Sequence, residues 1–480
     1  MLLADNSIER LTKAIEHNYA KMNIRTVLEL ISTKARLLYT YNQEYRDEQS
    51  EDILSSFADM YQKGFSHGSD EKTVLFYDGF GLDSRGLVQQ YLSGLIENNF
   101  RVWYVTAATD RLQQPQVVKI LEKGRSEFVS VKRVNISDKI AWLRNFCASH
   151  RFNVAFMYTT PWDVAGIVLF NMLKGRAIRY QINLTDHAFW LGAQAFDYCI
   201  EFRNYGAAIT RDYRRVDENR LLYLPYYPIV NERESFHGFP ELCQNKKVIF
   251  SGGAPYKTVD TNNTFYKLIE AILNRHNDVA FLYAGNGTVN GLDSLVKKYP
   301  EKVMHIPERS DLIEVMKHSR LFLNTYPISG ALMLQYAAIA ECIPVTLKRE
   351  WDDDADGLLK NEKVLQETFT DFSRVIEEID RLLEDEDYYL SKKKMLKGQV
   401  ITPPEFTKQL KQILENPKMV RFTRIEAVDT HLYRKTFAEN LTRKDVLQNI
   451  IQKGNTRVWR YFPDLLIERI FNKVKLWEGE

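Results

Sequence analysis

Four segments of the chain place glycine, basic or titratable residues directly after a short apolar run, where a strand is expected to end. The first is Ser251–Lys257, which follows the run Lys247–Phe250. Its adjacent glycines, Gly252 and Gly253, would let the backbone approach a ligand closely and point N–H groups at it. Lys257 could then reach a phosphate oxygen as a point charge. The alternative is a tight turn that carries a surface lysine.

The second segment, Leu321–Thr346, has the pattern of a strand, a glycine-bearing loop, a helix, a sharp stop and another strand. The helix is expected to begin near Gly330. Ser329, Ala331 and Leu332 would then border a helix N-terminus whose free N–H groups and dipole suit a diphosphate. The alternative is a structural corner that binds nothing, but ligands of open α/β sheets favour the carboxyl ends of strands.

The third segment, Thr185–Gly192, follows the apolar run that ends at Asn183. His187 titrates near neutrality and could take a proton from a hydroxyl group, and Asp186 could do this itself or orient the imidazole. Trp190 could stack on a sugar ring. Packed, structural roles for His187 and Trp190 are the alternatives.

The fourth segment, Asp78–Gly86, lies between an expected strand and an expected helix. Gly81 supplies a turn, Arg85 could pair with a phosphate, and Asp83 could bind a sugar hydroxyl. The alternative is that Asp83 and Ser84 only cap the helix.

A parallel sheet must position these loops. The strand Thr73–Tyr77, a helix over about 86–98 and the strand Arg101–Thr106 form a βαβ unit, which predicts parallel strands. The same alternation resumes after a polar linker, Asn231–Lys247. Further strands are expected at 128–131, 154–158, 178–182, 198–200 and 221–225, and then at 247–251, 279–283 and 320–324.

The predicted fold is therefore α/β, with two Rossmann-like βαβ domains and helical additions at both ends. The expected divisions are an N-terminal helical segment at 1–70, a first Rossmann-like domain at 71–235, a second at 236–400, and a helical region at 401–480. At 480 residues and 45% hydrophobic composition, the chain is long enough and apolar enough for two cores.

The segment Lys247–Thr346 resembles the nucleotide-binding half of GT-B glycosyltransferases, most of all the O-GlcNAc transferase type and related bacterial polysaccharide and protein glycosyltransferases. That type carries a stretch close to DTxPxxGxTTxxEALWxGVPVVT, which Asn324–Pro327, Gly330 and Ala337–Thr346 match. In that group the loop before the helix holds the nucleotide diphosphate, and a lysine of an upstream LYK segment contacts phosphate. Pro255–Lys257 takes that place here.

The resemblance implies two domains that face a cleft, with the donor held by the second domain and the acceptor by the first. It also implies that the turn at Gly285 and backbone groups near Ile306 lie at the base of the nucleotide. The paired threonines of the family are Leu332 and Met333 here, and the two glutamates of the retaining pattern would fall on Ser329 and Ala337. An inverting reaction is accordingly favoured.

The expected function is transfer of a hexosyl or N-acetylhexosaminyl group from a nucleotide sugar, by preference a UDP-sugar, to a hydroxyl of a bacterial glycan, a lipid-linked acceptor or a protein. Neither a metal nor a cofactor beyond the donor is expected. The alternative is a catalytically inactive GT-B partner that binds glycan or protein and supports another transferase. A dehydrogenase is disfavoured because GxGxxG with a following acidic residue is missing.

The net charge of +2 from 65 basic and 63 acidic residues disfavours nucleic acid as a partner. Four widely spaced cysteines predict reduced core residues, and the lack of an apolar run of about 18 residues predicts no membrane span, hence a cytoplasmic location. The aromatic and basic segment 458–477 would suit a helix at the inner face of a membrane, packing against the protein being the alternative. The aspartates of Trp351–Gly357 are expected in a solvated loop, and homo- or hetero-oligomers remain open.

Overall fold

The computed structural model describes residues 2–61, 72–83, 86–131, 135–230, 234–349, 358–360, 368–465 and 467. The chain divides into two compact units. Unit 1 comprises Met1–Leu224 and Thr407–Glu480, and unit 2 comprises Pro225–Phe406. The helices expected near both ends of the chain therefore belong to the same unit as the first sheet.

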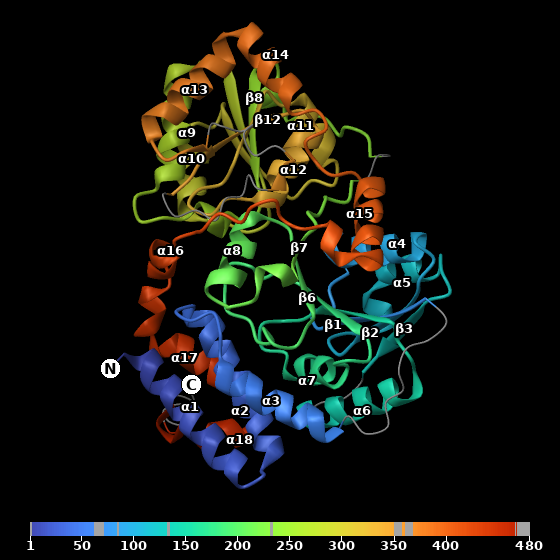
Figure 1. Ribbon diagram of the computed structural model, residues 1–480. Helices are drawn as coiled ribbons and strands as arrows, with labels where there is room; N and C mark the ends of the chain where they lie inside the picture. The colour runs from blue at the N-terminus through green and yellow to red at the C-terminus, as the bar shows by residue number, and fades with distance from the viewer. Residues whose placement is uncertain are drawn as a thin grey trace. The chain divides into compact units, whose positions relative to one another are not determined.

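The described part of unit 1 contains a seven-stranded parallel sheet with the order β3-β2-β1-β4-β5-β6-β7 (Figure 1). Every residue of β1 and β4 is buried, as expected for central strands covered by helices on both faces. The strands lie where the apolar runs predict them: β1 (Thr73–Asp78), β2 (Arg101–Thr106), β3 (Glu127–Ser130), β4 (Val154–Tyr158), β5 (Ile178–Ile182), β6 (Tyr198–Glu201) and β7 (Leu221–Tyr223).

Helices cover both faces of this sheet (Figure 1). α4 (Gly86–Glu97) and α5 (Pro115–Leu121) lie on one face, whereas α6 (Ile136–Ser149) and α7 (Val164–Met172) lie on the other. All nine residues of α7 are buried, because α3 packs over this helix from outside. α8 (Asn204–Asp212) follows β6.

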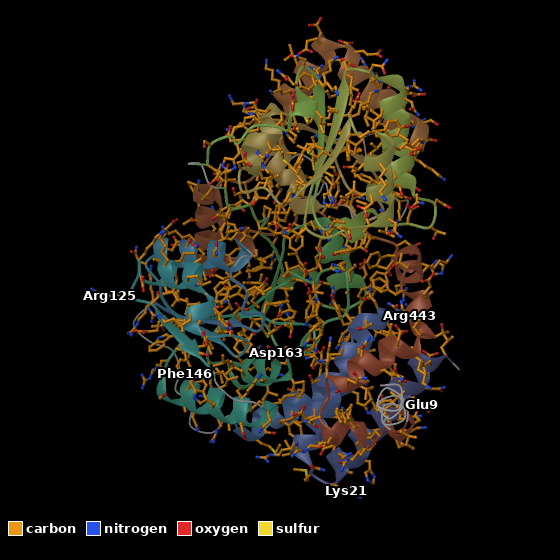
Figure 2. All side chains as sticks on the ribbon, turned by 180° about the vertical axis from the view of Figure 1, so that it is seen from behind. Glu9, Lys21, Arg125, Phe146, Asp163 and Arg443 are labelled. Atoms are coloured by element: carbon orange, nitrogen blue, oxygen red, sulfur yellow. The ribbon has the colours of Figure 1, made fainter. Side chains whose placement is uncertain are left out.

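The helices from the two ends of the chain pack together in unit 1, as the blue and red ribbons in Figure 1 show. The buried residues of α2 include Val27, Ile31 and Leu38, at the spacing of one helix face. Charged Glu9, Lys21 and Arg443 lie outside, whereas Asp163 lies inside the unit (Figure 2). The helices are α1 (Leu3–Ala20), α2 (Ile24–Tyr41), α3 (Glu48–Tyr61), α16 (His431–Lys435), α17 (Lys444–Gln452) and α18 (Thr456–Trp459).

The described part of unit 2 contains a six-stranded parallel sheet with the order β10-β9-β8-β11-β12-β13. Its strands are β8 (Lys247–Gly252), β9 (Val279–Ala284), β10 (Val303–Ile306), β11 (Leu321–Leu323), β12 (Ile343–Leu347) and β13 (Thr368–Phe369). Its helices are α9 (Thr264–Arg275), α10 (Asn290–Lys298), α11 (Leu312–His318), α12 (Ala331–Ile339), α13 (Phe372–Glu384), α14 (Glu386–Met395) and the start of α15 (Pro403–Glu415).

Both units share one topology. Each sheet grows outward over three strands, and the chain then returns to place the fourth strand beside the first. The order therefore reverses between β1 and β4 in unit 1 and between β8 and β11 in unit 2. Such a switch point opens a crevice at the carboxyl ends of the two strands, where ligands of open α/β sheets bind.

Several expectations about composition can be compared with the structure. All four cysteines are buried and free, which confirms them as reduced core residues. Over the described ranges, no helix is long and apolar enough to cross a membrane. Of the two alternatives for 458–477, packing against the protein holds for three residues, because Val458, Phe462 and Leu465 lie in the core of unit 1. Positions 468–477 lie outside the described residues.

Candidate functional site

The glycines after β8 and β9 bring two strand ends of unit 2 close together. Gly253 has a φ of +128°, and its N–H donates to the carbonyl of Ala284 over 2.9 Å. A Cβ atom at Gly252 would lie 2.8 Å from the same carbonyl, and one at Gly285 would collide with the Gly253 carbonyl. The N–H of Gly285 donates to the carbonyl of Ile306 over 3.0 Å. The N–H groups of Gly253 and Gly285, which were expected to face the donor, therefore form hydrogen bonds between neighbouring strand ends instead.

The side chain of Asn324 fixes the loop after β11. This residue is 1% exposed. Its Oδ1 accepts the N–H groups of Thr325 and Gly330 at 3.0 and 2.9 Å, and its Nδ2 donates to Thr346 Oγ1 over 3.3 Å. The Thr325 hydroxyl donates to the carbonyl of Ile328 over 2.7 Å. The N–H of Gly330, expected to bind phosphate, is therefore held by the protein, and the loop is preorganised.

The two loops at the β8/β11 switch point lie side by side. The N–H of Ile328 donates to the carbonyl of Lys257 over 3.2 Å. On the other side of the loop, Arg349 Nε donates to the carbonyl of Pro327 over 3.1 Å. The segments Ser251–Lys257 and Leu321–Thr346, which are far apart along the chain, are therefore in contact. Lys257 belongs to the first segment, and Arg349 contacts the second.

The loop leads into the N-terminus of α12. The first bond within this helix runs from the N–H of Leu334 to the carbonyl of Gly330, over 3.2 Å. Gly330 has no side chain that could cap the helix. The N–H groups of Ala331, Leu332 and Met333 consequently have no acceptor within the helix, and they carry the positive end of its dipole. These three amides, more than those of the glycines, can bind an anion here.

In unit 1, His187 lies in the segment after β5, at the carboxyl edge of the sheet. Its side chain is 35% exposed, and its Nδ1 lies 3.2 Å from Asp186 Oδ1. Asn42, the residue that follows α2, holds this segment, because its Oδ1 accepts the N–H of Phe189 over 3.1 Å. The ring edge meets Tyr433 with the centroids 6.2 Å apart. A histidine held through Nδ1 directs Nε2 away from the carboxylate, as a general base requires.

Asp186 is 1% exposed and lies beneath this histidine. Its oxygens accept hydrogen bonds from Arg203 Nε at 2.6 Å and Arg203 Nη2 at 3.0 Å. Burial by itself would raise the pKa of the Asp186 carboxyl, but the charge of Arg203 and the contact with His187 outweigh it and hold that pKa well below its usual range. Asp186 is therefore suited to orient His187 and unsuited to act as the base.

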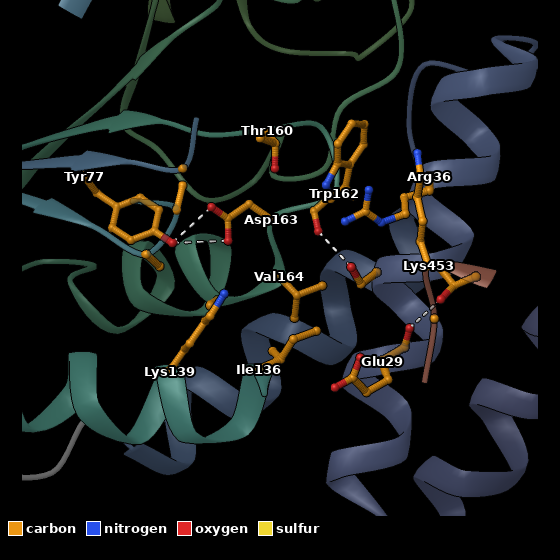
Figure 3. A pocket seen from close by; sticks show the side chains of 17 residues that line it. Glu29, Arg36, Tyr77, Ile136, Lys139, Thr160, Trp162, Asp163, Val164 and Lys453 are labelled. Carbon is orange, nitrogen blue, oxygen red and sulfur yellow. Dashed lines mark hydrogen bonds between the residues drawn. The ribbon is translucent and has the colours of Figure 1, made fainter. Parts of the chain in front are cut away.

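A cavity of about 290 Å³ opens at the β1/β4 switch point of unit 1 (Figure 3). Gly79 follows β1, and Thr160 and Asp163 follow β4. The walls come from α2, α6, the segment after β2 and the end of α17. The other lining residues are Glu29, Ser32, Thr33, Arg36, Tyr77, Ala107, Ala108, Ile136, Lys139, Trp162, Val164, Ala165, Lys453 and Gly454.

Asp163 is one of two carboxylates that line this cavity, the other being Glu29. It accepts hydrogen bonds from the Tyr77 hydroxyl, at 3.0 Å, and from the N–H of Gly166, at 3.0 Å. Burial raises the pKa of Asp163 above its usual range, although these two donors act in the opposite direction. A side chain at position 79 would collide with the carboxylate, so that only glycine fits there.

Comparison with known proteins identifies the fold. No protein-family model and no curated protein matches the sequence. Among solved structures, a mutant O-GlcNAc transferase from Thermobaculum terrenum aligns over 91% of this chain and 82% of its own, with a TM-score of 0.50 and 14% identity. A glycosyltransferase from Rickettsia africae aligns over 72% of this chain and 100% of its own, with a TM-score of 0.52 and 10% identity.

A proposed UDP-N-acetylglucosamine 2-epimerase from Listeria monocytogenes aligns over 75% of this chain and 99% of its own, with a TM-score of 0.53 and 10% identity. The chain has the GT-B fold. Its two Rossmann-like units are the two halves of that fold, as the sequence predicts.

In this GT-B chain, Gly81 and Asp83 of the loop after β1 form hydrogen bonds within the protein. The N–H of Gly81, whose φ is +63°, donates to Asp78 Oδ1 over 2.9 Å. Asp83 accepts the N–H groups of Gln116 and Val117 at 2.9 and 3.0 Å, and so caps α5. The alternative that Asp83 is a cap is therefore supported, although the helix is a different one. Arg85 lies outside the described residues.

The expectation that Trp190 stacks on a sugar ring is corrected. The residue is 3% exposed and belongs to the core of unit 1. The guanidinium of Arg214, itself fully buried, lies 4.7 Å from the centre of its ring. The indole therefore offers no face to a ligand.

Of the residues that line the cavity in Figure 3, Gly79 belongs to the segment Asp78–Gly86, and the others were not singled out from the sequence. Thr160–Asp163 could have been found, because these residues follow β4 beside β1 at a switch point. Arg36 carries no such signal, since it comes from a helix that precedes the first strand. In the part of the chain that the structure describes, no three His, Cys, Asp or Glu side chains form a group that could hold a metal. The aspartates at 352–354 lie outside that part.

Proposed function

We propose that this GT-B chain transfers a sugar from a nucleoside-diphosphate sugar, by preference a UDP-sugar, to an acceptor hydroxyl. One observation carries the proposal. Three features meet at the carboxyl edge of the sheet in unit 2: the N-terminus of α12, the loop that contains Lys257, and the loop whose Pro327 carbonyl accepts from Arg349. That edge is the switch point of the sheet, where the fold is expected to bind a nucleotide.

The chemistry follows from charge. As the bond between the anomeric carbon and the diphosphate breaks, negative charge develops on the leaving diphosphate oxygen. The N–H groups of Ala331, Leu332 and Met333 are fixed in place before the reaction, and they would stabilise this charge together with Lys257. These donors replace a metal ion, so that a metal-independent transfer of a hexosyl or N-acetylhexosaminyl group is proposed.

Unit 1 would supply the acceptor side. His187 Nε2 would take the proton of the acceptor hydroxyl while its oxygen attacks the anomeric carbon, and Asp186 would keep the imidazole oriented. The glutamates of the retaining pattern are replaced by Ser329 and Ala337, so the proposed transfer inverts the anomeric configuration. The acceptor is a glycan, a lipid-linked glycan or a protein.

A second candidate is a catalytically inactive GT-B partner. It is favoured by the engagement of the N–H groups of Gly253, Gly285 and Gly330 within the protein. It is also favoured by Leu332 and Met333, which stand where the family has two threonines. Such a chain would bind glycan or protein without turnover.

Release of UDP from a panel of UDP-sugars tests the proposal. Lys257→Ala is expected to slow UDP release about tenfold to a hundredfold, because a charge-assisted contact to phosphate is lost. Lys267→Ala, an exposed lysine on α9, is the matched control and should match wild type. Glycan binding without UDP release from any donor would instead support the inactive partner.

A further inference from the structure

The cavity at the β1/β4 switch point is lined by three cationic and two acidic side chains. The cations are Arg36, Lys139 and Lys453, and the acids are Glu29 and Asp163. Within the described residues, none of the three cations forms a salt bridge. The lining thus carries an excess of one positive charge, and positive charge in a confined site concentrates anions.

Arg36 is positioned to bind an oxyanion. Its guanidinium lies over the ring of Trp162, 4.3 Å from the centroid. A guanidinium that stacks through its face keeps its N–H edge available for a planar or tetrahedral oxyanion. Figure 3 shows Lys453 beside Arg36 on this side of the cavity.

The other side of the cavity offers hydrogen bonds to hydroxyl groups. Asp163 and Thr160 lie there, with Lys139 below them (Figure 3). The Tyr77 hydroxyl and the N–H of Gly166 hold the Asp163 carboxyl in place, which leaves lone pairs of its oxygens for a ligand. Carboxylates held in this way are suited to accept hydrogen bonds from sugar hydroxyls.

Size limits the ligand further. The volume of about 290 Å³ is at the lower end of the range of about 300 to 1,000 Å³ for ligand pockets. Arg36 covers one face of Trp162, and Tyr39 also meets this ring, with the centroids 5.4 Å apart, so the indole is poorly placed to stack on a base. A nucleotide is therefore disfavoured, and one substituted sugar ring fits.

We propose that this cavity binds a monosaccharide-sized polyhydroxyl ligand that carries one phosphate or carboxylate group. Arg36 and Lys453 bind the anionic group, and Asp163 and Thr160 bind hydroxyls. That this ligand is part of the acceptor rests on the proposed function. His187 does not line the cavity, so under that function the acceptor contains an acidic sugar beside the residue whose hydroxyl reacts.

Calorimetric titration of the full-length chain, without nucleotide, tests the inference. The probes are glucose 6-phosphate, glucuronate, glucose and inorganic phosphate. One of the two acidic sugars is expected to bind, and the comparison between them tells phosphate from carboxylate. Glucose and inorganic phosphate should each bind about tenfold more weakly or worse, because each lacks one half of the contacts.

Variants locate the binding. Arg36→Gln and Lys453→Gln should each weaken binding of the acidic sugar by about tenfold or more, and Arg36→Lys should restore part of the loss. Arg25→Gln is the matched control on α2, because Arg25 is 61% exposed and lies 3.6 Å from Asp138 outside the cavity. Lys257→Ala should leave the affinity unchanged, since that lysine belongs to unit 2.

Three results would overturn the inference: no binding of either acidic sugar, equal affinity for inorganic phosphate, or equal affinity in Arg36→Gln. Binding of an acidic sugar by a chain that binds no UDP would support the cavity and contradict the proposed function. UDP binding without binding of an acidic sugar would support the proposed function and contradict the ligand proposed for the cavity.

Discussion

At the scale of single residues, the arrangement of His187, Asp186 and Arg203 decides which group can move a proton. Arg203 occupies both oxygens of Asp186 and keeps this carboxyl ionised. The sequence alone leaves Asp186 and His187 as equal candidates, because adjacency along the chain does not reveal the arginine. Only the fold brings Arg203 to this position, and this arrangement favours His187 over Asp186 as the proposed base.

We predict that His187→Ala lowers the rate of sugar transfer by about 10² to 10⁴, the usual contribution of a general base. The thermal midpoint should hardly change, because the imidazole is partly exposed. His17→Ala, an exposed histidine on α1, is the control. Transfer at the wild-type rate in His187→Ala would assign the base elsewhere.

At the scale of elements, α3 holds the segment that follows His187. Glu51 of α3 is 1% exposed and accepts the N–H groups of Gly192, Ala193 and Gln194 at 3.1, 3.1 and 3.0 Å. Burial raises the pKa of Glu51 to about 7, although the three N–H donors act against this. The carboxyl thus binds its proton more tightly in the folded chain than in the unfolded chain.

The sign of the pH dependence follows. The contribution of Glu51 to the free energy of unfolding is greatest below pH 4.5 and decreases as the pH rises to about 7. The decrease is on the order of 3 kcal/mol at most. Glu51→Gln should remove this part of the pH dependence in denaturation at pH 5 and pH 8, and Asp52→Asn, exposed on the same helix, should retain it. An unchanged slope in Glu51→Gln would contradict the assignment.

Most of the strands were predictable because they are short apolar runs, whereas β13 (Thr368–Phe369), which has only two residues, was not predicted. The cavity was not, because its residues meet only through tertiary packing. Arg36 reaches the sheet edge from α2, a helix whose sequence shows an apolar face without any chemical motif. The sequence also suggested that the N–H groups of the glycines face a ligand. In the structure they donate to Ala284, Ile306 and Asn324, and these acceptors reach them only through the folding of the strand ends and loops.

At the scale of the whole molecule, the two ends of the chain complete unit 1. Phe462 is 1% exposed in the core that also contains Leu11 and Val27. Phe462→Ala is expected to lower the free energy of unfolding of unit 1 by about 3 to 5 kcal/mol through the cavity it leaves. Ile467→Ala, at a side chain that is 54% exposed, is the control. A stability equal to wild type in Phe462→Ala would place the C-terminal segment outside the core.

The central claim is that the first N–H groups of α12 bind a diphosphate, and a proline at Ala331 tests it most directly. Proline is tolerated at the first position of a helix, and Gly330, with a ψ of 87°, lies outside the α region that a following proline disfavours. The substitution removes one N–H group, whereas Ala331→Ser retains it. Calorimetry with UDP should show binding in wild type and Ala331→Ser, and about tenfold weaker binding in Ala331→Pro. Equal UDP affinity in all three proteins, or no binding in wild type, would contradict the account.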